Sequence, residues 1–164
     1  MTMRPALALY QPDIPQNTGT LLRLGACLGV EIHIVGPPGF RLDDRALKRA
    51  GLDYIGAAAL QQHIDWPDFE TWRRQNNRRL VLATTRGATP YTKFAFSPTD
   101  VLLLGRETAG VPDRVHDAAA ARLAVPMVAG MRSLNVAVAG AMIIAEALRQ
   151  TDRFPVQAKI HQKS

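Results

Sequence analysis

The sharpest chemical signal in the sequence is the loop GRETAGVP at residues 105–112, which follows a short apolar run. Its glycines, Gly105 and Gly110, have the spacing of a phosphate-binding P-loop. However, Val111 and Pro112 stand where such a loop needs the lysine and the hydroxyl residue that reach phosphate and Mg²⁺. No G-x-G-x-x-G motif follows any apolar run either. The sequence therefore argues against nucleoside triphosphate hydrolysis and weakens a dinucleotide-binding interpretation.

Other segments carry small and polar residues of the kind that approach a ligand. Residues 84–87 (TTRG) follow the apolar run LVLA, and residues 125–135 (VPMVAGMRSLN) form an irregular turn whose polar groups could do chemistry. Arg23 lies off the apolar stripe of its helix. It could therefore point across the carboxyl edge of a sheet, where ligands bind in open α/β folds. The alternative, which the pattern alone favours, is a solvated surface arginine.

Apolar runs alternate with helical stretches along the chain. The expected strands lie at residues 6–10, 31–35, 80–83, 101–104 and 122–125, and the expected helices lie at 17–28, 45–50, 68–75 and 134–148. Asn17 is the expected cap of the first helix and Gly29 its stop, and Pro112 suits the first turn of a further short helix. The alternation predicts the α/β class, with a parallel sheet covered on both faces. We expect a cofactor where strands end, near Ala83, Gly105 and Val125.

The helix at 134–148 is apolar on every side until Glu146. Such a helix is normally buried all round, yet about 15 residues are too few to span a bilayer, which needs about 20. One core in a chain of this length rarely surrounds a helix completely. We therefore predict that this helix also packs against a second copy of the protein, with Gly140 allowing a close approach. The alternative is a central helix of a monomer.

Composition sets the outer limits of the interpretation. The length of 164 residues and 47% hydrophobic content fit one domain, 1–164, with a polar tail at 151–164. A formal charge of +6 favours a polyanionic partner, with nucleic acid the first candidate. The single cysteine, Cys27, is expected in the core and suits a reducing compartment. No charged leader precedes a long apolar run, so we expect a cytoplasmic protein.

Basic residues cluster in two places. The first cluster lies on and just before the predicted helix 45–50 and consists of Arg41, Arg45, Lys48 and Arg49. These residues form either a solvated helix face or a set of phosphate contacts. A second cluster precedes the strand at 80–83 and consists of Arg73, Arg74, Arg78 and Arg79. His33 is assigned to its strand and not to a metal site.

The segments NTGTLLR, LLLGRETAGVP and VPMVAGMRSLNVAVAGA together resemble, in order and spacing, the three motifs of the SpoU-type branch of the SPOUT methyltransferases. With YQPDIPQNTGT and RLDDRALKRAGLDY, the resemblance covers about residues 7–150. It is greatest to the minimal bacterial enzymes that methylate the 2′-hydroxyl of the tRNA wobble nucleotide, cytidine or uridine 34. It implies a deep C-terminal trefoil knot, a homodimer formed through the C-terminal helix, and S-adenosylmethionine in the knotted crevice. S-adenosylhomocysteine would be the product, with no metal and no membrane.

The resemblance also assigns residues to roles. The cofactor pocket would be lined by Ala83, Thr84, Gly105, Val125, Met127, Ser133 and Leu134. The reaction centre would hold Asn17, Arg23, Glu107, Ser133 and Asn135. Because no separate RNA-binding domain is expected, the tRNA phosphates would meet Arg41, Arg45, Lys48, Arg49, Arg86 and Arg106.

The implied reaction is an in-line attack of the ribose 2′-oxygen on a sulfonium methyl group. The family view makes Arg23 the base, but a guanidinium with a pKa above about 12 is a poor proton acceptor. We expect Arg23 to bind a phosphate or the developing alkoxide, and a desolvated arginine base is the alternative. Glu107 would hold Arg23 or its own loop. Ser133 and Asn135 would fix the ribose and the crevice.

Two positions depart from the pattern that the resemblance sets. Arg106 stands where relatives commonly have proline, and Ala137 stands where many have serine. Two other functions remain open. One is 2′-O-methylation of another tRNA or ribosomal RNA nucleotide, and the other is a catalytically silent RNA-binding module on the same fold. The complete set of polar positions argues against the silent module.

Overall fold

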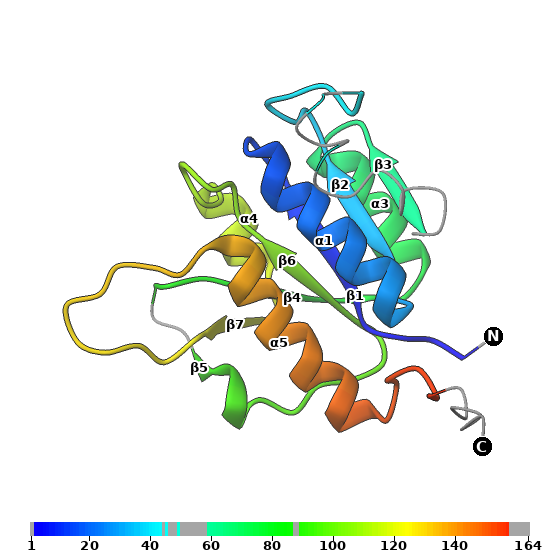
Figure 1. The fold of residues 1–164 in the computed structure, drawn as a ribbon, viewed down its shortest axis with the longest axis vertical. Helices are drawn as coiled ribbons and strands as arrows, with labels where there is room; N and C mark the ends of the chain where they lie inside the picture. Colours follow the sequence, from blue (N-terminus) through cyan, green and yellow to red (C-terminus); the bar gives the residue numbers. More distant parts are fainter. Residues whose placement is uncertain (1, 44, 46–48, 50–58, 87–88, 158–164) are drawn as a thin grey trace, which may run out of the picture.

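A parallel β-sheet with helices on both faces forms the protein (Figure 1). The structure is a computed structural model that describes residues 2–43, 45, 49, 59–86 and 89–157. Its strands are β1 (Ala6–Tyr10), β2 (Ile32–Val35), β3 (Leu60–His63), β4 (Arg79–Ala83), β5 (Thr89–Pro90), β6 (Asp100–Leu104) and β7 (Ala121–Ala124). Its helices are α1 (Pro15–Leu28), α3 (Trp66–Gln75), α4 (Asp113–Ala118), α5 (Val136–Thr151) and the 3-10 helix η2 (Tyr91–Lys93).

The strands lie in the order β3-β2-β1-β6-β4-β7-β5, and each neighbouring pair is parallel. β1 and β6 lie in the middle, and every residue of both is buried. This burial explains why β1 and residues 101–104 of β6 read as unbroken apolar runs, since both faces of these strands are covered by other elements. β2 and β3 lie on one side of β1, and the later strands lie on the other side. The strand order therefore reverses between β1 and β6, and ligands commonly bind at the carboxyl edge of such a switch point. The predicted parallel α/β class is confirmed.

The five predicted strands are each confirmed to within one residue, but β3 and β5 were missed. β3 has the sequence LQQH and lies at an edge of the sheet, where two of its four residues are exposed. β5 is two residues long, contains Pro90 and lies at the opposite edge. Edge strands tend to be short, polar or interrupted by proline, so they lack the apolar pattern by which buried strands are found.

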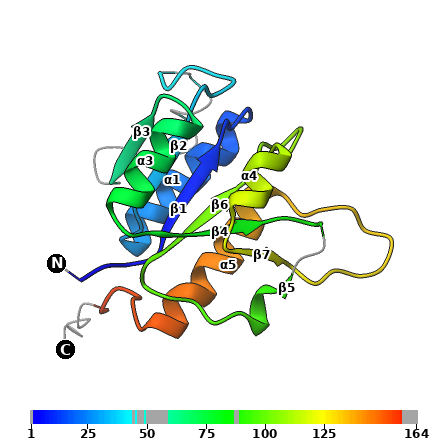
Figure 2. The ribbon, with the colours of Figure 1, turned by 180° about the vertical axis from the view of Figure 1, so that it is seen from behind.

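Each face of the sheet has its own hydrophobic core. α1 and α5 cover one face, where Leu22 and Ile144 pack against Leu7 and Leu104. α3 and α4 cover the other face, seen from behind in Figure 2, where Phe69 packs among residues of the central strands. Both layers are needed because a parallel sheet exposes apolar side chains in both directions.

The start of α1 differs from the prediction. The helix begins at Pro15, whose ring fixes a helical φ at the first position, and the N-cap Ile14 makes no side-chain hydrogen bond to the helix. Asn17 is therefore not a cap, and its side chain is available for contacts elsewhere. The predicted end is confirmed, since Gly29 adopts a left-handed φ of 66°.

The C-terminal helix is only partly buried in the single chain, in line with the expectation that one core does not surround it completely; its packing against a second copy stays a prediction. α5 begins at Val136 and lies so close to β6 that a Cβ on Gly140 would come within 2.6 Å of a Leu104 methyl carbon. On its outer side, Val138 is 49% exposed and Met142 is 37% exposed. One sheet and one neighbouring helix cover only part of its circumference. None of the described helices has both the length and the hydropathy that a bilayer span requires.

Cys27 was expected in the core and is exposed. It lies six residues after the buried Leu21 on α1, which places it about 240° around a helix of 100° per residue. Cys27 therefore does not share the buried face on which Leu21 lies.

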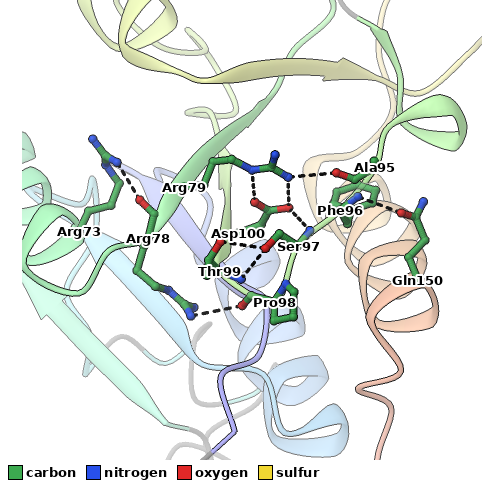
Figure 3. A network of polar contacts seen from close by, with 10 residues as sticks. All are labelled: Arg73, Arg78, Arg79, Ala95, Phe96, Ser97, Pro98, Thr99, Asp100 and Gln150. Carbon is green, nitrogen blue, oxygen red and sulfur yellow. Dashed lines mark hydrogen bonds and ion pairs between the residues drawn. The ribbon is translucent and has the colours of Figure 1, made fainter.

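The second basic cluster stabilises the fold. Arg78 is 9% exposed and donates to the backbone oxygens of Arg4 and Pro98, at 2.9 and 3.5 Å. Arg79 forms a bidentate pair with the buried Asp100 at 2.5 and 2.8 Å, as Figure 3 shows. Since these guanidinium groups already have protein partners, they are poorly placed to bind a polyanion.

Two buried histidines join the edge strand β3 to its neighbour β2. Nδ1 of His33 lies 2.8 Å from Nε2 of His63, and Nε2 of His33 lies 2.5 Å from a carboxylate oxygen of Glu31. The assignment of His33 to a strand is confirmed. Burial, and next the neighbouring His33, lower the pKa of His63 below its ordinary value, because a positive charge on His63 is poorly accommodated at this buried position.

The histidine pair predicts a pH-dependent stability. Because the folded chain resists protonating His63 and the unfolded chain does not, the free energy of unfolding should fall as pH drops below about 6.5. In His63→Gln, the slope of the free energy of unfolding against pH should decrease by the equivalent of up to about one bound proton. Urea midpoints measured from roughly pH 5 to 8 test this, with Gln62→Ala on the same strand as the control. The contribution of Glu31, whose pKa is lowered from 4.5, falls in a separate window below that value. An unchanged slope in His63→Gln would contradict the prediction.

Candidate active site

A cavity of about 510 Å³ opens at the carboxyl ends of β4, β6 and β7. Its wall includes every residue that the sequence assigned to a cofactor, namely Ala83, Thr84, Gly105, Val125, Met127, Ser133 and Leu134. They come together because strands in a parallel sheet end at the same edge, so the loops that follow them are neighbours in space. Cavities of this size commonly hold small organic ligands.

A tight turn after β6 shapes one wall of the cavity. The backbone amides of Arg106 and Gly110 each donate to the other residue's carbonyl, at 2.9 and 2.7 Å. A Cβ on Gly105 would lie 2.9 Å from the Cα of Gly110, so only glycine fits at that position without moving the backbone. Gly110 itself has a φ of 63°. The two glycines therefore serve a narrow turn, and the resemblance of their spacing to a P-loop is incidental.

Three polar side chains from distant segments form a hydrogen-bonded chain along the cavity wall. Oδ1 of Asn135 caps α5 by accepting from the amides of Ala137 and Val138, at 2.9 and 3.2 Å. Its Nδ2 donates to Oδ1 of Asn17 at 2.9 Å. Nδ2 of Asn17 in turn donates to a carboxylate oxygen of Glu107 at 3.5 Å. The structure thus brings together three of the five residues predicted for the reaction centre.

Asp13, which the sequence analysis did not single out, holds the turn after β6 from the other side. Its backbone amide donates to Glu107 at 2.9 Å, and its carboxylate accepts from Nε of Arg106 at 3.2 Å and from the hydroxyl of Thr108. Hydrogen bonding with Glu107, Thr108 and Arg106 lowers the pKa of Asp13 to about 2. Burial, and next the neighbouring Asp13, raise the pKa of Glu107. The only sequence signal for Asp13 was its place in the proline-rich exit from β1.

The other two predicted reaction-centre residues differ in position. Ser133 lines the cavity from the loop that precedes α5, which Figure 1 shows as a wide excursion from the sheet. Arg23 lies on the exposed side of α1 and is not among the residues that line the cavity in the single chain. Glu107 accepts hydrogen bonds from the backbone of Asp13 and the side chain of Asn17, and its expected role of holding Arg23 or its own loop stays a prediction.

The residues predicted to meet tRNA are spread around the carboxyl edge and the segment after β2. Arg41, Arg45, Arg49 and Arg86 are exposed, and Arg41 and Arg86 pair with Asp43 and Asp113, each at 3.3 Å. Arg106 lines the cavity itself. Lys48 and most of the predicted helix 45–50 lie outside the described residues. In the part of the chain that the structure describes, no group of three or more His, Cys, Asp or Glu side chains could hold a metal ion.

Sequence comparison gives consistent relatives. The tRNA (cytidine(34)-2′-O)-methyltransferase of Ancylobacter novellus is 59% identical over 152 residues, which cover 93% of this chain and 96% of the relative. The protein of the same name from Escherichia coli K12 is 39% identical over 146 residues, covering 88% of this chain and 92% of the relative.

Solved structures share the fold. One, described as giving structural insights into the 2-OH methylation of C/U34 on tRNA, has a TM-score of 0.85 and 37% identity, covering 92% of this chain and 97% of its own. An AdoMet-bound rRNA methyltransferase from Sinorhizobium meliloti has a TM-score of 0.83 and 27% identity, covering 91% of this chain and 57% of its own. The model of the SpoU rRNA methylase family matches residues 4–145. Together with the cavity and its polar wall, this match shows that the chain belongs to the SpoU rRNA methylase family.

Proposed function

We propose that the protein transfers a methyl group from S-adenosylmethionine to the ribose 2′-hydroxyl of the wobble nucleotide, cytidine or uridine 34, of tRNA. The observation that carries the proposal is the cavity, in which one polar chain from Asn135 through Asn17 to Glu107 borders a wall of strand ends. The relatives named for this reaction match nearly the whole chain and not one motif alone.

The cavity suits S-adenosylmethionine. An adenine ring can pack against apolar side chains of the cavity wall, which are those of Leu104, Leu123, Val125 and Ile143. The bare backbone at Gly105 allows a close approach. When bound, S-adenosylmethionine supplies an electrophilic methyl group on a positively charged sulfur. The protein has to hold the donor and the ribose in line and exclude water from between them.

The polar residues have separate roles in positioning the ribose and its phosphate. Ser133 and Asn135 line the cavity, where they can orient the ribose. Arg23 binds a phosphate or the developing alkoxide. For that role its helix must face the cavity of a second copy, because Arg23 is not in the wall of its own.

The proposal includes a homodimer and a knot. The exposed Val138 and Met142 on α5 provide an apolar face for a second copy, which would also bring Arg23 to the partner's cavity. The family resemblance further predicts that the segment from β7 to α5 completes a deep trefoil knot around the cofactor. Phosphates of tRNA would meet the exposed arginines and Arg106, which makes binding strongly salt dependent. We expect the protein to act in the cytoplasm, where its tRNA substrate is found.

The decisive experiment incubates the purified protein with labelled S-adenosylmethionine and bulk tRNA, and maps the methylated nucleotide. We expect label at the 2′-oxygen of nucleotide 34. Label at another nucleotide would replace the proposed substrate, and label in ribosomal RNA alone would indicate the wider family activity. Tight tRNA binding without any transfer would identify a silent RNA-binding module.

Arg23→Ala should abolish turnover and leave cofactor affinity nearly intact, because Arg23 lies outside the cavity wall of its own chain. Single-turnover kinetics measure the first effect, and calorimetric titration with S-adenosylhomocysteine measures the second. Arg4→Ala, which removes another exposed arginine, is the control. Loss of cofactor binding in Arg23→Ala would contradict this assignment.

Two substitutions at Asn135 should separate its capping role from its role in the polar chain. Asn135→Ala removes the cap of α5 and should lower the free energy of unfolding by about 1 kcal/mol. Asn135→Asp keeps a capping oxygen, so stability should stay near the wild-type value. A carboxylate cannot donate to Asn17, however, and kcat should fall about tenfold or more in both variants. Full activity in Asn135→Asp would show that the polar chain is dispensable.

A further inference from the structure

The cavity wall contains a single carboxyl group. Of the described residues that line it, only Arg106 and Glu107 carry an ionisable side chain. The described lining contains no histidine, cysteine, lysine, tyrosine or aspartate. A guanidinium gives up its proton only at very high pH. Among these lining residues, Glu107 is therefore the one side chain that can accept a proton near neutral pH.

The surroundings of Glu107 favour its protonated form more than those of an ordinary glutamate. The side chain is partly buried, and its nearest carboxyl neighbour is Asp13. Arg106 and Thr108 both bind the same oxygen of Asp13, which keeps that carboxylate ionised. Burial and the adjacent Asp13 raise the pKa of Glu107, whereas that of Asp13 falls to about 2. The two carboxyl groups thus divide into a fixed anion and a group that can take up a proton.

Asp13 also has an oxygen with room for that proton. Its Oδ1 is buried and receives no hydrogen bond from any described residue, although Oδ2 receives two. A buried carboxylate oxygen without a donor is costly unless a donor arrives during function. Glu107 is held beside it by the backbone amide of Asp13 at 2.9 Å and, more loosely, by Asn17 at 3.5 Å.

We propose that Glu107 accepts the proton of the ribose 2′-hydroxyl, and that Asp13 is a positioning residue that holds Glu107 for this step. The inference rests on the proposed function. In the step, the 2′-oxygen forms a bond to the methyl carbon, and the bond from that carbon to sulfur breaks with its electron pair left on sulfur. The hydroxyl proton passes to the Glu107 carboxylate, which then donates a hydrogen bond to Asp13. In this step Arg23 binds phosphate or the alkoxide and does not act as the base.

The pH dependence of kcat/KM for tRNA tests the role of Asp13. Wild type should lose activity on the acidic side as Glu107 becomes protonated. Asp13→Asn removes the negative charge that favours this protonation, so the acidic limb should move at least about half a pH unit lower while the plateau rate falls. Asp117→Asn is the matched control, because it removes an exposed carboxylate of α4 outside the cavity wall and should leave the limb in place. An acidic limb that is unmoved or moves upward in Asp13→Asn would overturn the proposal.

A measurement on the wild-type protein makes the test independent of whether Asp13→Asn folds. Carboxyl carbon NMR should show Glu107 titrating above its ordinary value of 4.5, and a midpoint at or below that value would overturn the proposal. Glu107→Gln should lower kcat about 100-fold or more and remove the acidic limb. Retention of that limb in Glu107→Gln would contradict the assignment of the base. Because all the kinetic tests start from an active wild type, failure of the proposed function would appear first, as absence of any tRNA methylation.

Discussion

The helix that Asn135 caps dictates the orientation of the polar chain in the cavity. Two amides at the start of α5 require an oxygen, so the side-chain amide of Asn135 must direct Oδ1 to the helix and Nδ2 away from it. Asn17 must then turn its own oxygen to Asn135 and its NH₂ group to Glu107. The helix amides thus fix the orientation of Asn135, and Asn135 fixes that of Asn17. The NH₂ group of Asn17 then faces Glu107, where only an acceptor can pair with it. No rotation of one member is possible without breaking a contact of the next.

The parallel sheet supplies the rest of the arrangement. Asp13 follows β1, the turn 105–110 follows β6 and the long loop 125–135 follows β7, so segments more than a hundred residues apart meet at one edge. At that edge a polar site is built from side-chain amides and carboxyl groups of Asn17, Glu107 and Asn135. Its narrow turn, made possible by Gly105, presents Arg106, Glu107 and Thr108 to a single aspartate.

The sequence could predict the buried strands and the residues that follow them, because burial leaves an apolar pattern and a parallel sheet gathers strand ends. It could not predict the edge strands, which lack that pattern. It also misplaced Cys27 and the start of α1, because apolar neighbours were counted without their helical angle and because Pro15 sets the first turn. Asp13 was missed for a different reason. Its partners lie about ninety residues away, and no local spacing encodes such a contact.

The arginines show why net charge alone says little about where a polyanion binds. Arg78 and Arg79 look like a basic patch in the sequence, yet Arg78 donates to backbone carbonyls and Arg79 pairs with a buried aspartate. Arg106 is a different case, since its contact with Asp13 adds to the hydrogen bonds from Glu107 and Thr108 that lower the pKa of that aspartate. A lysine at 106 would supply the charge, but not the planar Nε–H that meets Asp13. Whether an arginine stabilises the fold or acts in the site therefore depends on the groups that it contacts. The fold determines those contacts, and the composition does not.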